Sequence, residues 1–497
     1  MNALSKKILL AVVPLVIITA AGGYFVFIPQ QEKKHEQRIA ALIASLPGNL
    51  GADSITVHAL GKSAEIRGLR GATRYFGSDV NLDVALLTLS GLNFTPGKGV
   101  DKLADSLIIS GLAITETANP PQPQAMTQDI ALKNLELHDL RGDFNAVAEL
   151  FGEASLAHKM GILATFSIGS SRMRDYTVTM HTVLGPIVMS LDSSETQEAS
   201  LLTAKNSVSK NLRLTSLDTE IIGLDRLSAA SMKVPNILAP MFELMETEDF
   251  DAAGELILEK FRKEALEVRG LALEGLRFQL MMPEPVSVST LKLDLMASAD
   301  RLAVKKEVQG LSLPPAIYGP MSLEAAQFSE FYEKPLDLDL RKDIVLTHTS
   351  GAPISISIND LFIRDKNLAS AQFKGELLYR DDEAKHVFAV FDSDPDDLLL
   401  KNAVLTLTDK ALVATFLEAE FGDKAADMRE MMAQGLVAMS ALGGESFILI
   451  AEGLAKLIRV PGTLTITGAP ELPVSLADPL DVMMKALRLT VEYTPAK

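Results

Sequence analysis

The sequence contains no cysteine and no tryptophan, and aromatic residues make up only 5% of its 497 positions. Without cysteine the chain can form no disulfide, use no thiolate nucleophile and offer no cysteine ligand to a metal. With so few aromatic rings it also lacks the stacking platforms of many nucleic-acid and sugar binders. The compartment stays open, because a cysteine-free chain suits an oxidising periplasm but also occurs in the cytosol.

Positive charge is also scarce, since 47 Lys and Arg against 64 Asp and Glu give a formal net charge of −17. Nucleic acids are bound by basic surfaces that release counterions, so we expect no nucleic-acid partner. Apolar residues, in contrast, make up 47% of the chain and charged residues 22%. This balance predicts a folded protein, and the length predicts several folding units.

One long apolar run lies near the N-terminus. Residues 8–28 read ILLAVVPLVIITAAGGYFVFI without a charge, which is long enough for a helix to cross the roughly 30 Å hydrocarbon core of a bilayer. Lys6 and Lys7 precede the run and favour a cytoplasmic N-terminus. We therefore expect a single-pass protein of a bacterial inner membrane with its body in the periplasm. The alternative is a cleaved signal peptide, with small residues at 19–21 as the cleavage site.

Beyond this run the pattern predicts a β-rich α+β fold, in which an N-terminal transmembrane helix is followed by curved antiparallel sheets with packed helices. We expect a cytoplasmic tail and anchor at 1–28 and a helical stalk at 29–50. A first β-rich domain at 51–240 and a second at 241–420 with a leading helix follow, and then a helical C-terminal part with short strands at 421–497.

The expected strands rest on apolar residues at alternate positions. In the first β-rich domain a helix at 143–160 and an irregular stretch follow the strands, and a helix at 240–268 leads into the second. The expected strands are 54–60, 65–69, 80–94, 106–115, 130–140, 268–280, 286–295, 336–346, 354–363 and 371–379.

A Gly-Leu step recurs in or near the expected strands, with its glycine at positions 68, 91, 111, 223, 270 and 275. Glycine inside a strand commonly marks a bulge or bend. If every step bends its strand the same way, the sheets curl into a trough. The simpler alternative is that two common residues adjoin by chance.

The expected C-terminal helix at 423–442 carries four methionines at 428, 431, 432 and 439. We expect these flexible side chains to fill a protein core, and contact with an acyl chain is the alternative.

No catalytic or metal-binding motif is complete. His35-Glu36 begins like a zinc-protease HExxH, but Ile39 stands where the second histidine is needed. The acidic run at 392–397 resembles a calcium loop, but Asp397 replaces the required glycine and Ala403 the final glutamate. The seven histidines are scattered singly. We predict no catalytic, cofactor-binding or metal-binding residue, hence no enzyme and no cofactor; a hydrolase assembled from distant residues is a further alternative.

The layout of the chain resembles the YdgA-like and AsmA-like envelope proteins of Gram-negative bacteria. The likeness lies in KKILLAVVPLVIITAAGGYFVFI, in the strand segments ITVHAL and AEIRGLRG, and in PGTLTITGAPELPVSLADPLDVMMKAL near the C-terminus. The resemblance implies an inner-membrane anchor and a periplasmic body. For the AsmA-like branch it implies a curved sheet with an apolar interior, associated with outer-membrane assembly or phospholipid movement.

These lines combine into one expected function. We expect a membrane-anchored binding or scaffold protein of the envelope that holds lipid on a curved apolar sheet and supports envelope assembly or lipid transport. Its partners are then the inner membrane through residues 8–28, and phospholipid or another envelope protein. The alternative is a structural or protein-interaction module with closed cores and no ligand.

Overall fold

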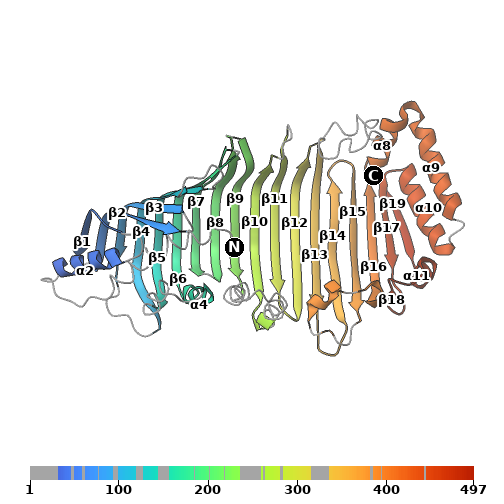
Figure 1. Cartoon of the computed structure of the whole chain (residues 1–497). Coiled ribbons are helices and arrows are strands. Elements are labelled where there is room, and N and C mark those ends of the chain that lie inside the picture. Colours follow the sequence, from blue (N-terminus) through green and yellow to red (C-terminus); the bar gives the residue numbers. More distant parts are fainter. Residues whose placement is uncertain are drawn as a thin grey trace. The chain divides into compact units, whose positions relative to one another are not determined.

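The computed structural model describes residues 32–496 with gaps at 46–49, 59–61, 76–77, 93–98, 119–126, 144–155, 184, 201, 218, 236–258, 261–262, 280–283, 315–334, 381–383, 385, 393 and 441–443. The chain divides into two compact units, unit 1 (Met1–Lys260) and unit 2 (Phe261–Lys497). Both are built from long antiparallel strands with a few helices (Figure 1), which confirms the β-rich α+β fold class.

Unit 1 is an antiparallel meander in which each strand pairs with the next along the chain. All five strands expected between residues 54 and 140 are present. The expected irregular stretch is wrong, because four long strands fill most of it. The elements are α2 Glu32–Ser45, β1 Ser54–His58, β2 Ser63–Tyr75, β3 Ser78–Ser90, β4 Val100–Ala118, β5 Thr127–Asp143, α4 Leu156–Leu163, β6 Ser167–Thr182, β7 Gly185–Ser200, β8 Thr203–Ser216 and β9 Thr219–Lys233.

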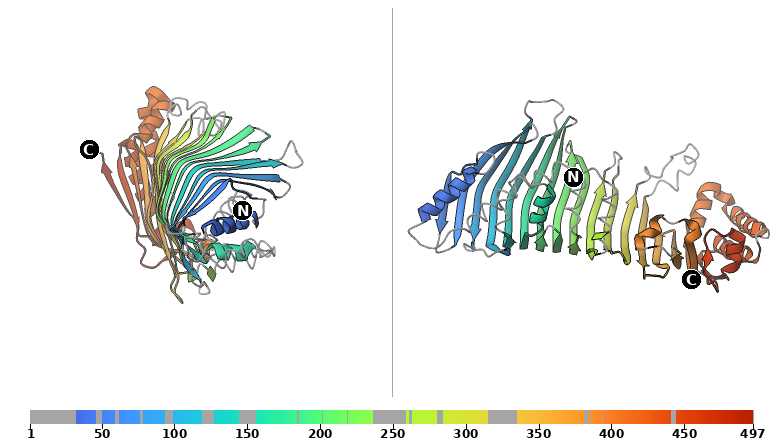
Figure 2. Two further views of the ribbon diagram at one scale, coloured as in Figure 1. Left: turned by 90° about the vertical axis from the view of Figure 1, so that its left-hand side faces the viewer. Right: turned by 60° about the horizontal axis from the view of Figure 1, so that its bottom comes forward.

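The strands of unit 1 bend along their length (Figure 2, left). The bend follows a line of left-handed residues on alternate strands, which we call the crease: Gly68 on β2, Gly111 on β4, Asp175 on β6 and Asn211 on β8, with φ of 59°, 66°, 51° and 54°. Gly111 shows why. An added Cβ there would lie 2.9 Å from the Ala85 Cβ on β3, and only glycine adopts this φ without steric cost.

The crease also interrupts the alternation of side chains between the two faces of the sheet. Ile109 and Leu112 are three residues apart, which in a flat strand puts them on opposite faces, yet both are buried in the same core. Ile66 and Leu69 straddle Gly68 in the same way. A prediction that assumes strict alternation of side chains between the two faces is therefore wrong at the crease.

Two helices cover part of one face of unit 1, and we call this the inner face. Ile39 and Ile43 of α2 and Ile162 of α4 are buried in the core formed by the strands, and both helices lie on the concave side of the bent sheet (Figure 2). The helix expected as the stalk at 29–50 is thus present over Glu32–Ser45, but it packs on the sheet instead of standing away from it.

Unit 2 is a second meander from β10 to β16, extended by β17 against β16 and β19 against β17, with β18 also beside β16. The expected strands are present, and β12 and β16 were not expected. The helix expected at 240–268 lies mostly outside the described residues, and β10 begins at Leu266. The strands are β10 Leu266–Phe278, β11 Val286–Ala297, β12 Arg301–Leu313, β13 Leu336–Thr347, β14 Ile354–Asp365, β15 Ala369–Tyr379, β16 Leu398–Asp409, β17 Gly462–Gly468, β18 Val474–Ser475 and β19 Thr490–Pro495.

A buried carboxylate holds a bend in unit 2. Gly310 on β12 has φ of 59°, and its amide donates to Asp339 Oδ1 at 2.9 Å. Arg364 on β14 also donates to this carboxylate. Burial opposes ionisation of Asp339, but the hydrogen bonds from Arg364 and Gly310 outweigh it and lower its pKa.

The helices of unit 2 gather towards its C-terminal end (Figure 1), where α10 packs on β17 and β19. The expectation that the methionines of α9 fill a core is wrong for three of the four. Met431, Met432 and Met439 are exposed, with Met439 at 73%. The helical elements are η4 Val387–Asp392, η5 Pro395–Asp397, α8 Leu412–Phe421, η6 Gly422–Lys424, α9 Ala425–Ser440, α10 Glu445–Arg459 and α11 Leu480–Ala486.

Across the described residues, no helix combines the length and the apolar character needed to cross a bilayer. The span expected at residues 8–28 lies outside them.

Candidate functional site

The inner face of unit 1 carries apolar side chains that follow one another from strand to strand. We call the row next to the crease the first row and its neighbour the second row. Because directly opposed residues of an antiparallel pair share a face, the strand register defines both rows. The first row is Leu69, Val84, Leu112, Leu132, Tyr176, Leu191, Leu212 and Leu224; the second is Leu82, Ile114, Ile130, Val178, Met189, Leu214 and Ile222.

Burial along these rows is lower at β7 and β8 than on the strands to either side, where Val178 on β6 and Leu224 on β9 are buried. On β2 to β5 the first row is buried, and Leu69 and Val84 are fully so. On β7 and β8 the same rows continue with Leu191, Leu212 and Leu214, all of them only partly buried. Apolar surface therefore stays in contact with water at β7 and β8, and a stripe of this kind marks a surface that can bind an apolar ligand.

Across the crease from these rows, the inner face becomes polar at the same strands. The row that holds Ile66, Leu87 and Ile109 on β2 to β4 continues through Ser194 on β7 and Ser209 on β8, and becomes apolar again at Leu227 on β9. Ser194 Oγ and Ser209 Oγ lie 2.9 Å apart and form a hydrogen bond.

A second hydroxyl pair lies beside the first. Thr196 Oγ1 and Ser207 Oγ are 3.0 Å apart, again between β7 and β8. We call the two pairs the hydroxyl ladder. It places hydrogen-bonding groups directly next to the partly buried apolar rows, and an amphipathic molecule needs both kinds of surface.

The outer face of unit 1 is charged and exposed to solvent. Arg172 on β6 lies 2.8 Å from Glu195 on β7, and Lys133 on β5 lies 3.1 Å from Asp175 on β6. All four side chains are well exposed, so these pairs contribute little to stability. The contrast between the faces singles out the inner face as the candidate site.

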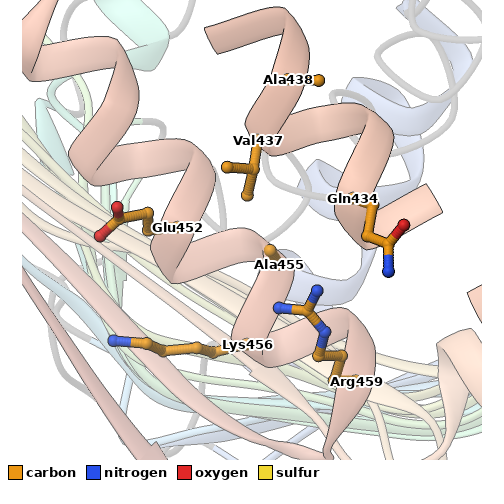
Figure 3. Close-up of a pocket in the computed structure, with 7 residues that line it drawn as sticks. All are labelled: Gln434, Val437, Ala438, Glu452, Ala455, Lys456 and Arg459. Carbon is orange, nitrogen blue, oxygen red and sulfur yellow. The ribbon is translucent and has the colours of Figure 1, made fainter. Parts of the chain in front are cut away.

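A hollow of about 430 Å³ lies between α9 and α10 in unit 2. Figure 3 shows Arg459 at its edge and Lys456 extending away from α9. The Arg459 guanidinium donates two 2.8 Å hydrogen bonds to Glu430, and these bonds, with one from Gln434, lower the pKa of Glu430 to about 2. The lining residues are Gln434, Val437, Ala438, Glu452, Ala455, Lys456 and Arg459. They offer no hydroxyl or imidazole nucleophile, so the hollow has no group that could act as a nucleophile.

The incomplete motifs of the sequence stay incomplete in space. Ile39, at the place of the second zinc-binding histidine, is buried in the core of unit 1. In the acidic run the Asp397 amide donates to the Asp394 carbonyl oxygen at 3.1 Å, which forms a local turn. Within the described ranges, no three His, Asp or Glu side chains are grouped so that they could hold a metal ion.

Two histidines do meet carboxylates. His181 Nε2 lies 2.8 Å from Asp129 Oδ2 on the exposed side of β6, and His348 Nδ1 lies 4.0 Å from Asp300. Neither pair has a neighbouring serine hydroxyl among the hydrogen bonds of the described residues, so neither forms a nucleophile–base arrangement.

The sequence analysis did not identify β6 to β9, yet a signal for them is present. The crease occurs in the segment IRGL at 66–69 and again in ISGL at 109–112. The segments MRDY at 173–176 and SKNL at 209–212 follow the same spacing, with Asp175 and Asn211 in place of glycine. Asp and Asn are the other residues that tolerate the left-handed region. No protein-family model matches this chain, and no curated protein matches its sequence.

Proposed function

We propose that this chain is a membrane-anchored binding protein of the bacterial envelope, which holds lipid acyl chains on the inner face of unit 1. The proposed anchor is the apolar run at 8–28, with the body in the periplasm. In this proposal the protein is not an enzyme, uses no cofactor and binds no nucleic acid. Its partners are the inner membrane and phospholipid, and its role is to support envelope assembly or lipid transport.

The observation that carries the proposal is the pair of apolar rows that continue, partly buried, across β7 and β8. Neighbouring strands lie about 4.8 Å apart, so the partly buried stretch of the rows on β7 and β8 is on the order of 10 Å wide. Each methylene group buried there contributes about 0.8 kcal/mol. The adjoining hydroxyl ladder gives the polar end of the same molecule hydrogen-bond partners.

The test is the lipid content of the full chain after gentle detergent extraction, measured by mass spectrometry. We expect phospholipid to copurify with the wild type. Leu191→Asp places a charge in the first row and is expected to reduce the amount of bound lipid. Ser190→Asp is the matched control, because it puts the same charge on the same strand but on the outer face, and it should retain lipid. A wild-type protein that is empty, or a control that loses lipid equally, contradicts the proposal.

A protein-docking role without a ligand is the second candidate, and a different observation favours it. The helices α8 and α9 expose Phe416, Met431 and Met439 together with other apolar side chains. Methionine-rich surfaces adapt to varied protein partners. Crosslinking of this surface to one envelope protein, together with a lipid-free inner face, would favour this role.

A further inference from the structure

Two lysines lie side by side on the apolar face of unit 2. Lys306 on β12 and Lys342 on β13 are direct register partners. Their face is the one that carries Leu346 and Ile356 of the unit 2 core, because Lys306 and Lys342 lie four residues from Leu302 and Leu346 in an unshifted stretch of register.

Every register neighbour of this pair on that face is apolar. On either side stand Leu293 of β11 and Leu361 of β14. Along the two strands stand the paired residues Val304 and Ile344 in one direction, and Val308 and Leu340 in the other. The two ammonium groups are thus an island of positive charge in an apolar surface.

The two positive charges repel each other, so this arrangement is unfavourable unless a negatively charged group binds to them. Directly opposed side chains have Cβ atoms about 5 Å apart, and like charges at such positions destabilise a sheet. Both lysines are exposed, and within the described part of the chain neither makes a hydrogen bond or an ion pair. On the opposite face of the same strands Arg341 lies 3.3 Å from Asp360, and Lys292 of β11 lies 3.9 Å from Glu307.

We propose that Lys306 and Lys342 together bind the phosphate group of a phospholipid, whose acyl chains lie on the surrounding apolar residues of unit 2. A phosphate offers several oxygens to two ammonium groups at once. The lysine stems lie along apolar surface while their charged ends reach the ligand. The inference rests on the proposed function, that the chain binds lipid, and adds the chemistry of the head group and a site in the second unit.

Two features favour a lipid over other anions. A free, fully hydrated ion gains nothing from Leu293, Leu361 and their neighbours, whereas an acyl chain does. A polyanion is repelled by the formal net charge of −17. Phe388 of η4 packs against the same core cluster as Ile344 and Ile358, whereas both lysines are exposed.

The test measures the affinity of the detergent-solubilised full chain for three soluble probes: dioctanoyl phosphatidylglycerol, dioctanoylglycerol, which has the same chains without phosphate, and inorganic phosphate. The variant is the double substitution Lys306→Gln with Lys342→Gln. We expect it to remove the tighter phospholipid site, the one in unit 2, so that the remaining phospholipid binding is weaker by about tenfold or more, and to leave binding of dioctanoylglycerol unchanged. Added salt should weaken binding of the phospholipid to the wild type only.

Lys305→Gln is the matched control, because Lys305 is also exposed and lies next to Lys306 but on the opposite face. It should bind the phospholipid like the wild type. Thermal unfolding should show the double variant to be at least as stable as the wild type, because two opposed like charges are removed.

The possible outcomes separate the two proposals. If no lipid probe binds the wild type, both fail. If both lipid probes bind wild type and double variant equally, lipid binding stands and the lysine site is overturned. If inorganic phosphate binds through the lysines and the lipids do not, the proposed ligand is wrong.

Discussion

Two regions of unit 1 are built from the same rows of one sheet but differ in how far those rows are buried. At β2 to β4 the inner face is filled by large aliphatic residues beneath α2, and Ile66 and Leu87 are fully buried. We call this the closed end. At β7 and β8 the corresponding positions hold Ser194 and Ser209, and the neighbouring Leu212 is only partly buried. We call this the open end. Backbone geometry alone therefore does not decide whether a sheet face becomes a core; side-chain size and a covering helix do.

The largest expected difference comes from deleting one leucine at each end. Leu87→Ala leaves a cavity at the closed end and should lower the free energy of unfolding by about 3 kcal/mol. Leu191→Ala removes a side chain that water already reaches, and should cost about 1 kcal/mol. Hydrogen exchange of the β3 and β7 amides measures each end separately. Equal losses of unfolding free energy would show that Leu191 is packed in a core as Leu87 is, which would contradict the distinction between the two ends.

The crease gives a second comparison, with glycine at the closed end and asparagine at the open end. Gly111→Ala meets both the strained φ of 66° and the Ala85 Cβ, and should cost about 2 kcal/mol. Asn211→Gly relieves a milder strain but loses the 2.7 Å hydrogen bond to Asp192, so the change should stay within about 0.5 kcal/mol. Urea unfolding followed by circular dichroism checks both. A tolerated alanine at 111 would contradict the role of the crease.

One serine pair of the hydroxyl ladder can be replaced by apolar side chains of the kind found at the closed end. Replacing Ser194 and Ser209 together by valine removes both partners of one hydrogen bond, so stability should change by less than about 1 kcal/mol. The open end should then present more apolar surface, and the amount of copurified lipid should rise. Lipid mass spectrometry and thermal unfolding of the same preparation test this. A loss of lipid would mean that the hydroxyl groups supply more of the binding than the apolar rows do.

The smallest expected effect depends on pH. Burial opposes ionisation of Asp139 on β5, next to the closed end, but hydrogen bonds from Arg141 and Lys102 outweigh it and lower its pKa. Because the folded pKa lies below the unfolded one, this carboxylate stabilises the fold above about pH 4 and ceases to do so as the pH falls through the folded pKa. Asp139→Asn should cost about 0.5 kcal/mol at neutral pH, since the side chain is 37% exposed.

Measuring unfolding at about pH 7 and about pH 3 checks the direction, because the difference between wild type and Asp139→Asn should shrink in acid. Glu198→Gln is the matched change at the open end. Glu198 and its partner Lys205 are 64% and 56% exposed, so its effect should be smaller still. A difference that grows in acid would contradict the sign.

Much of the fold was predictable from local pattern. The strands between residues 54 and 140 alternate clearly, because one face is buried and the other is exposed to solvent, and α9 lies within the helix expected at 423–442. Five of the six glycines of the Gly-Leu step have positive φ. The strands β6 to β9 were missed because serine and threonine replace aliphatic residues across the crease on β7 and β8, and because the crease shifts the alternation at Asp175 on β6 and Asn211 on β8.

The candidate site was not predictable in the same way. Nothing in the sequence distinguishes Leu87, which is fully buried, from Leu191, which is not. The methionines of α9 are apolar in any sequence pattern, and only the packing of α10 onto β17 and β19 left Met431 and Met439 exposed.

The sequence by itself determined the β-rich class, the places where left-handed residues bend the strands and the absence of thiol chemistry. These depend on local sterics and on residue identity, and both are properties of short segments. Only the tertiary structure decided which rows are covered by α2 and α4, and that Lys306 stands opposite Lys342. Burial and cross-strand pairing depend on contacts between residues far apart in the chain, and the local preferences of short segments do not specify such contacts.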